Sequence, residues 1–92
     1  MLVKKLKVMN KSGVHARPAG MIADLTSKYK SDVFFVYRGV RANAKSILNL
    51  MMLAIVPDTE VEVEVDGPDA SEVFAALEKL FDERFQEENQ DT

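Results

Sequence analysis

The sequence predicts a two-layer α+β domain in which three helices cover one face of a four-stranded antiparallel sheet. A chain of 92 residues is long enough for one compact domain and too short for two. The hydrophobic periodicity changes along the chain in the order β-α-β-β-α-β-α. Apolar residues keep one parity in the first and fourth predicted strands, so one face of the sheet should be buried and the other should meet water.

The first half of the chain contains a strand, a helix and a hairpin. Apolar residues that alternate with lysine predict a strand over residues 2–8. Apolar side chains at spacings of three and four predict a helix from Ala16 to about Tyr29. The β-branched and aromatic run Val33–Tyr37 predicts a second strand, and Arg38-Gly39 should turn the chain into a third strand over residues 40–43.

The second half contains two helices and one strand. Residues Ser46 to about Ala54 predict a short helix with Ser46 as its N-cap. From Glu60 to Asp66, valines alternate with carboxylates, which is the clearest strand pattern in the sequence. The last helix should begin after Gly67-Pro68-Asp69, and its apolar stripe continues to Phe85.

Composition excludes several classes of site. The chain has no cysteine, so it has neither disulfides nor thiolate metal ligands, and it has a single histidine. Its longest apolar-rich stretch is about half of the ~20 residues that a membrane span needs, and its first residues do not resemble a signal peptide. We therefore expect a cytoplasmic protein without membrane insertion. Residues 1–86 should form the domain, and residues 87–92 a polar, frayed tail.

Charge is distributed unevenly along the chain. The net charge is −3, which argues against a nucleic-acid partner. Residues 1–45 nevertheless carry ten Lys and Arg against two Asp and Glu, whereas residues 46–92 carry two against thirteen. If the first strand pairs with the fourth, Lys5 and Lys7 lie across from the row of glutamates in the fourth strand. Much of the charge polarity is then neutralised within the fold.

The only histidine lies in the run Gly13-Val14-His15-Ala16-Arg17-Pro18. Pro18 is tolerated in a first helical turn, so the helix should start within a residue or two of His15. Backbone N–H groups without intrahelical partners and the helix dipole would make an anion site there, and Arg17 adds a bidentate donor. A neutral imidazole in this position is a nucleophile for phosphorus. On this physical argument alone, a histidine that merely caps the helix is an equally good interpretation.

Two motifs shift that balance. The run Gly-Val-His-Ala-Arg-Pro-Ala resembles the active-site segment of HPr, the histidine-containing phosphocarrier family of the bacterial phosphotransferase system. The segment Ala44-Lys45-Ser46-Ile47-Leu48 is similar to the second motif of that family, around its regulatory serine. Motif spacing, chain length and the predicted element order also fit, and the resemblance covers about residues 2–86.

The resemblance implies a phosphoryl carrier rather than an enzyme that turns over a substrate alone. His15 matches the phosphorylated residue, with Nδ1 as the acceptor nitrogen, and Arg17 matches the residue that stabilises the phosphoryl group. The donor would be enzyme I, charged by phosphoenolpyruvate, and the acceptor an enzyme IIA domain. No metal or cofactor is needed within the domain for this chemistry, and the resemblance implies a monomer.

The resemblance also concerns the second helix. Ser46 matches a regulatory serine that a dedicated kinase, a serine kinase/phosphorylase, modifies in some bacteria; a plain N-cap is the other interpretation, and the two are compatible. The short helix is apolar on nearly every side, so part of it is either buried or left exposed for docking. The resemblance assigns the partner interface to five residues: Ala16, Gly20, Ile47, Leu48 and Met51.

Three alternatives stay open at this point. A nitrogen-branch phosphocarrier would use the same chemistry with different partners. A regulatory HPr-like protein would act through Ser46 alone, although the presence of His15 and Arg17 speaks against it. A small ligand- or RNA-binding domain would need exposed aromatic side chains on a basic sheet face, whereas the fourth strand offers four acids.

Overall fold

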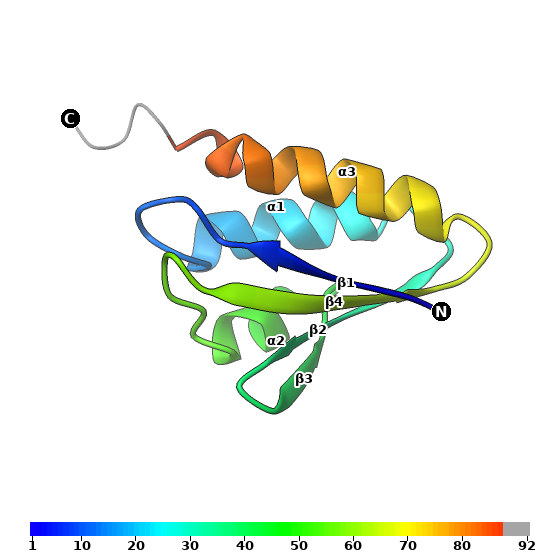
Figure 1. The fold of residues 1–92 in the computed structure, drawn as a ribbon, viewed down its shortest axis with the longest axis horizontal. Helices are drawn as coiled ribbons and strands as arrows, with labels where there is room; N and C mark the ends of the chain where they lie inside the picture. The colour runs from blue at the N-terminus through cyan, green and yellow to red at the C-terminus, as the bar shows by residue number, and fades with distance from the viewer. Residues whose placement is uncertain (88–92) are drawn as a thin grey trace.

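The computed structural model describes residues 1–87 and has the predicted α+β architecture, with the element order β-α-β-β-α-β-α. Figure 1 shows the helices α1 and α3 lying side by side over one face of the sheet, with the short α2 at its lower edge. The elements are β1 (Leu2–Lys7), α1 (Ala16–Thr26), β2 (Asp32–Tyr37), β3 (Val40–Asn43), α2 (Ile47–Met52), β4 (Glu60–Asp66), α3 (Ala70–Asp82) and a 3₁₀ turn, η1 (Arg84–Gln86).

The strand order in the sheet is β1-β4-β2-β3, and every neighbouring pair is antiparallel. The three valines of β4 and the alternate residues of β2 point to the helices and are buried, as the parity of the sequence predicts. Phe35 of β2 meets Phe81 of α3 edge to face, with ring centroids 6.1 Å apart. The core therefore lies between the sheet and the helix pair α1 and α3.

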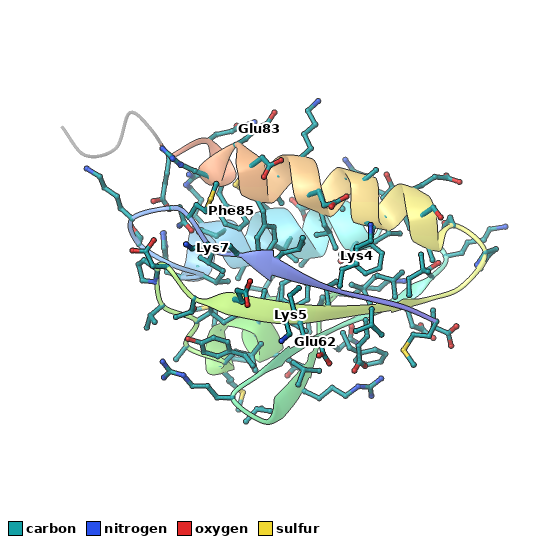
Figure 2. All side chains as sticks on the ribbon, in the orientation of Figure 1. Lys4, Lys5, Lys7, Glu62, Glu83 and Phe85 are labelled. Atoms are coloured by element: carbon teal, nitrogen blue, oxygen red, sulfur yellow. The ribbon has the colours of Figure 1, made fainter. Side chains whose placement is uncertain are left out.

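The register of β1 on β4 confirms the predicted pairing of opposite charges. Lys5 lies opposite Glu62 and Lys7 opposite Glu60. Figure 2 shows Lys5 and Glu62 next to each other on the open side of the sheet, whereas Lys4 points to α3. The third glutamate of the row, Glu64, accepts a hydrogen bond from Arg41 Nε at 3.0 Å instead. Part of the charge asymmetry along the chain is thus balanced across the sheet.

All three helices end earlier than the hydrophobic pattern alone indicates. After Ser27, the backbone hydrogen bonds of α1 change from i−4 to i−3, so the residues that follow are not α-helical. At the same end of the helix, the Thr26 hydroxyl donates to Ala44 O at 2.8 Å. In α2, Leu53 and Ala54 also bond three residues back, and Ala54 has a φ of 52°.

The C-terminal end of α3 corrects the expectation of one continuous helical stripe to Phe85. The helix stops at Asp82, and Arg84, Phe85 and Gln86 all take left-handed φ values. The reversal places the Phe85 ring, which is fully buried, 5.0 Å from the Phe81 ring. Phe85 therefore belongs to the core, as its apolar character predicts, but through a turn and not through a helix (Figure 2).

No helix formed by residues 1–87 is long and apolar enough to cross a membrane.

Candidate functional site

His15 stands at the start of α1, where the position of Pro18 predicts it. It is the N-cap residue, its backbone is extended (φ −96°, ψ −162°), and its carbonyl oxygen accepts from Ala19 N at 2.9 Å. Its side chain makes no capping hydrogen bond and is 44% exposed. The imidazole is therefore not used to cap the helix, although the backbone is. The N–H groups of Ala16 and Arg17 lie in the first turn, where they lack intrahelical partners.

The loop before His15 depends on a glycine. Gly13 has a φ of 69°, and a Cβ atom there would collide with the carbonyl oxygen of Ile55. That oxygen accepts from Val14 N at 3.0 Å, and the Gly13 carbonyl accepts from Asn10 Nδ2 at 2.8 Å. The loop is thus bonded to Ile55, in the segment after α2, and internally to Asn10. These two bonds fix the backbone that carries His15.

Arg17 lies at the same end of α1 but turns toward the C-terminal segment. Its Nη2 donates to Phe85 O at 2.6 Å, and its Nη1 lies 3.0 Å from the sulfur of Met21. A thioether is a weak hydrogen-bond acceptor, so exchanging Met21 for another acceptor costs Nη1 only a weak hydrogen bond. The sequence prediction places the guanidinium over a phosphate at His15; in this structure its strong hydrogen bond goes to Phe85.

Glu87 is a site residue that the sequence analysis placed in a polar tail. Its side chain is only 4% exposed, and its Oε2 lies 3.3 Å from His15 Nε2. Asn10 Nδ2 donates to the same oxygen at 2.8 Å, and Ser12 N donates to Oε1 at 3.4 Å. The one signal in the sequence is Phe85, whose burial draws the chain back to α1. The other residues of the expected tail, 88–92, lie outside the described residues.

The charge state of Glu87 follows from these contacts. Burial alone raises the pKa of this carboxyl, but the hydrogen bonds from Asn10, His15 and Ser12 outweigh burial and lower the pKa below its usual value. The carboxylate is consequently an anion at neutral pH, at the edge of the imidazole ring.

Ser46 caps α2 as predicted. Its backbone is extended, and its hydroxyl accepts from Asn49 N at 3.2 Å. The helices α1 and α2, which carry the two sequence motifs, pack against each other: a Cβ atom on Gly20 would lie 4.0 Å from Ile47 Cδ1.

The α2 helix buries one residue of its six and exposes most of the rest. Leu50 is fully buried, whereas Leu48 is 67% exposed. Four large apolar side chains of this helix reach solvent, and we call them the α2 patch: Ile47, Leu48, Met51 and Met52. Of the two possibilities left open by the sequence, the exposed apolar surface is the one found, and its Ile47 lies close to Gly20 of α1.

Among residues 1–87, no three carboxylate or imidazole side chains come together in a group that could hold a metal ion.

Comparison with known proteins matches residues 2–83 to the family described as the PTS HPr component phosphorylation site. The chain belongs to the HPr family. Among curated HPr proteins, the phosphocarrier protein HPr of Treponema pallidum is 42% identical over 88 residues, which cover 96% of this chain and 100% of that protein. The phosphocarrier protein HPr of Neisseria meningitidis serogroup A is 39% identical over 87 residues, 95% of this chain and 98% of that one.

Solved HPr structures share the fold. The crystal structure of an HPr from Thermoanaerobacter tengcongensis is 33% identical and superposes with a TM-score of 0.91 over 96% of this chain and 99% of that one. A second similar structure is Crh, a Bacillus subtilis catabolite repression protein that forms a swapped, intertwined dimer. It is 38% identical, with a TM-score of 0.69 over 96% of this chain and 97% of that one.

Proposed function

We propose that this member of the HPr family accepts a phosphoryl group on His15 from phosphorylated enzyme I and passes it to an enzyme IIA domain. One observation carries the proposal: the imidazole at the start of α1 is exposed and takes no part in capping the helix. An exposed nucleophile that is not needed for folding is what a covalent carrier requires. The protein would be used and regenerated, and would act in the cytoplasm.

The surroundings of His15 suit a transferred phosphoryl group. The first-turn N–H groups of α1 and the positive end of its dipole favour an anion, and no acidic residue stands in that turn. Arg17 can add a bidentate donor if its guanidinium exchanges Met21 and Phe85 for phosphoryl oxygens. Transfer would then depend on position and electrostatics shared with each partner.

The test of the carrier role is uptake of phosphate. The purified chain is incubated with enzyme I of the same cell and phosphoenolpyruvate, and its mass is measured before and after acid treatment. One added phosphoryl group that acid removes is the expected result. If the chain gains no phosphate from any enzyme I of its own cell, it is not a carrier of this system.

The α2 patch is the proposed docking surface for enzyme I and enzyme IIA, together with Ala16 and Gly20. It is apolar, it adjoins α1 near Gly20, and methionine side chains adapt to more than one partner. This surface would determine which enzyme IIA docks there, and whether the partners belong to the sugar or the nitrogen branch.

Leu48→Asp is expected to lower kcat/KM for phosphoryl transfer from enzyme I about tenfold or more, because a charge in a desolvated interface removes a central contact. The matched control is Val3→Asp. Val3 is also an exposed apolar residue, but it lies in β1 on the face of the sheet away from the helices. The control should stay within about twofold of the wild type. Equal losses in both variants, or none in Leu48→Asp, would contradict a docking role.

Ser46 is proposed as a regulatory phosphorylation site for a serine kinase. A phosphate at a helix N-terminus is electrostatically favourable, so the modification should leave the fold intact and add about −2 charge beside the α2 patch. Cell extract with ATP should add an acid-stable phosphate to the wild type and to Ser27→Ala, but not to Ser46→Ala. An acid-stable phosphate that persists in Ser46→Ala would show that another residue is modified.

A purely regulatory protein that acts through Ser46 is the second candidate, and the likeness to Crh is the observation behind it. The exposed His15 favours the carrier, because a protein that works through Ser46 alone has no use for a free imidazole at this position. We expect a monomer, as the resemblance to the HPr family implies.

A further inference from the structure

The C-terminal segment folds back over the start of α1 and contacts both residues of the first motif. After α3, three successive left-handed residues reverse the chain, and the buried Phe85 ring fixes the reversal. Figure 1 shows the end of α3 arriving beside the β1–α1 loop. Phe85 O then receives Arg17, and the Glu87 carboxylate reaches His15. The segment that follows α3 is therefore part of the site.

Glu87 is held in place independently of the imidazole. Asn10 Nδ2 donates both to Glu87 Oε2 and to Gly13 O, each at 2.8 Å, so the amide links the carboxylate to the loop that precedes His15. Ser12 N supplies a donor to the other carboxylate oxygen. Buried carboxylates are rare in proteins unless they are paired in this way. The carboxylate is thus preorganised with one oxygen facing His15 Nε2.

An ionised carboxylate only accepts hydrogen bonds, so the imidazole nitrogen that it contacts must be the donor. His15 Nε2 therefore carries the proton, and in the neutral ring the lone pair lies on Nδ1. The hydrogen bond at one ring nitrogen sets the state of the other. The same logic operates in the Asp–His pair of serine hydrolases, with the two ring nitrogens exchanged.

We infer that Glu87 is a positioning residue for phosphoryl transfer: its anchored carboxylate holds the Nε2–H of His15 and so presents Nδ1 to phosphorus. The inference rests on the proposed function of His15. In the transfer step the Nδ1 lone pair forms the bond to phosphorus, and the bond from phosphorus to the donor breaks with its electron pair leaving on the donor. The proton stays on Nε2. The ring thereby gains positive charge, which the adjacent carboxylate stabilises.

The test reads the tautomer of the free protein. His15 is the only histidine, so a two-bond ¹H–¹⁵N spectrum of the labelled chain contains a single imidazole. It is recorded at about pH 8.5, roughly two units above the ordinary histidine pKa. The wild type should show a protonated Nε2 and an unprotonated Nδ1. In Glu87→Gln the amide can donate as well as accept, so the spectrum should move toward a mixture of the two tautomers.

Glu83→Gln is the matched control. Glu83 directly follows α3 and is exposed, and Figure 2 shows it on the side of the helix end opposite to Phe85. The substitution removes the same charge, and its spectrum should equal that of the wild type. A wild-type ring with its proton on Nδ1 would overturn the inference, and so would a Glu87→Gln spectrum identical to that of the wild type. The wild-type spectrum alone shows which ring nitrogen carries the proton, so this part of the test holds even if Glu87→Gln detaches the C-terminal segment.

A kinetic measurement separates the inference from the proposed function. Glu87→Gln should slow phosphoryl uptake from enzyme I roughly 10–100-fold, by analogy with the loss seen when the hydrogen-bond partner of a metal-ligating histidine is removed. Glu83→Gln should not slow it. If the wild type takes up phosphate and Glu87→Gln does so at an unchanged rate, positioning by Glu87 is wrong and the carrier role stands. If the wild type takes up none while the tautomer is as expected, the carrier role fails, and only the assignment of the His15 tautomer to Glu87 stands.

Discussion

Replacing His15 with alanine is expected to abolish the uptake of acid-labile phosphate from phosphoenolpyruvate and enzyme I. The effect should be complete, because the described groups that contact the ring or Arg17 offer no free nucleophile: the Glu87 carboxylate is buried and held by Asn10 and Ser12, and guanidinium and amide groups do not attack phosphorus. Mass measurement of intact protein after incubation with both reagents gives the result directly.

The fold should survive this substitution. The His15 side chain makes no capping hydrogen bond and is 44% exposed, and its backbone contact with Ala19 does not depend on the ring. Without the ring, Glu87 loses one contact but keeps its hydrogen bonds from Asn10 and Ser12. Circular dichroism should therefore give a Tm within a few degrees of the wild type, because surface substitutions of this kind are usually within about 0.5 kcal/mol. Uptake of acid-labile phosphate by a folded His15→Ala would place the acceptor elsewhere in the chain.

The largest expected effect on stability is that of Phe35→Ala. Phe35 is fully buried in the strand β2 at the middle of the sheet, and its ring meets Phe81 of α3. Removing a buried phenylalanine ring costs about 3–5 kcal/mol, a large part of the 5–15 kcal/mol that typically stabilises a domain. The urea midpoint should fall accordingly, with little change in the m-value.

Phe34→Ala is the control for this prediction. Phe34 is the same residue type one position earlier, but it lies on the open face, half-buried, with the Arg41 guanidinium 3.6 Å from its ring centroid. Losing that contact and part of its apolar area should cost about 1 kcal/mol. Similar losses in the two variants would mean that the helix-covered face of β2 has been assigned wrongly.

The fold follows from the sequence because its signals are local and agree with one another. The alternation of valine and glutamate in β4 places one face against the helices, and Pro18 with Gly13 fixes where α1 begins. The pairing of β1 with β4 joins distant parts of the chain and was expected from the resemblance to the HPr family; the opposite charges on the two strands fit the register that is found. The strand and helix signals themselves depend on residue types that are close together in the chain.

The contacts of the C-terminal segment were not predictable in the same way. The helical stripe that ends on Phe85 gives no indication that three non-glycine residues take left-handed backbone angles. That reversal depends on where the Phe85 ring fits between Phe81 and the rest of the core, which is a tertiary property. The approach of Glu87 to His15 joins residues 72 positions apart, and no short-range pattern encodes such a contact.

We expect His15 Nδ1 to be the atom that carries the phosphoryl group. The ¹⁵N and ³¹P spectra of the labelled chain, recorded after incubation with enzyme I and phosphoenolpyruvate, identify this atom. The phosphorus should be coupled to Nδ1 of the single imidazole while Nε2 keeps its proton. Phosphorus bound to Nε2, or to any group other than the His15 ring, would contradict this expectation.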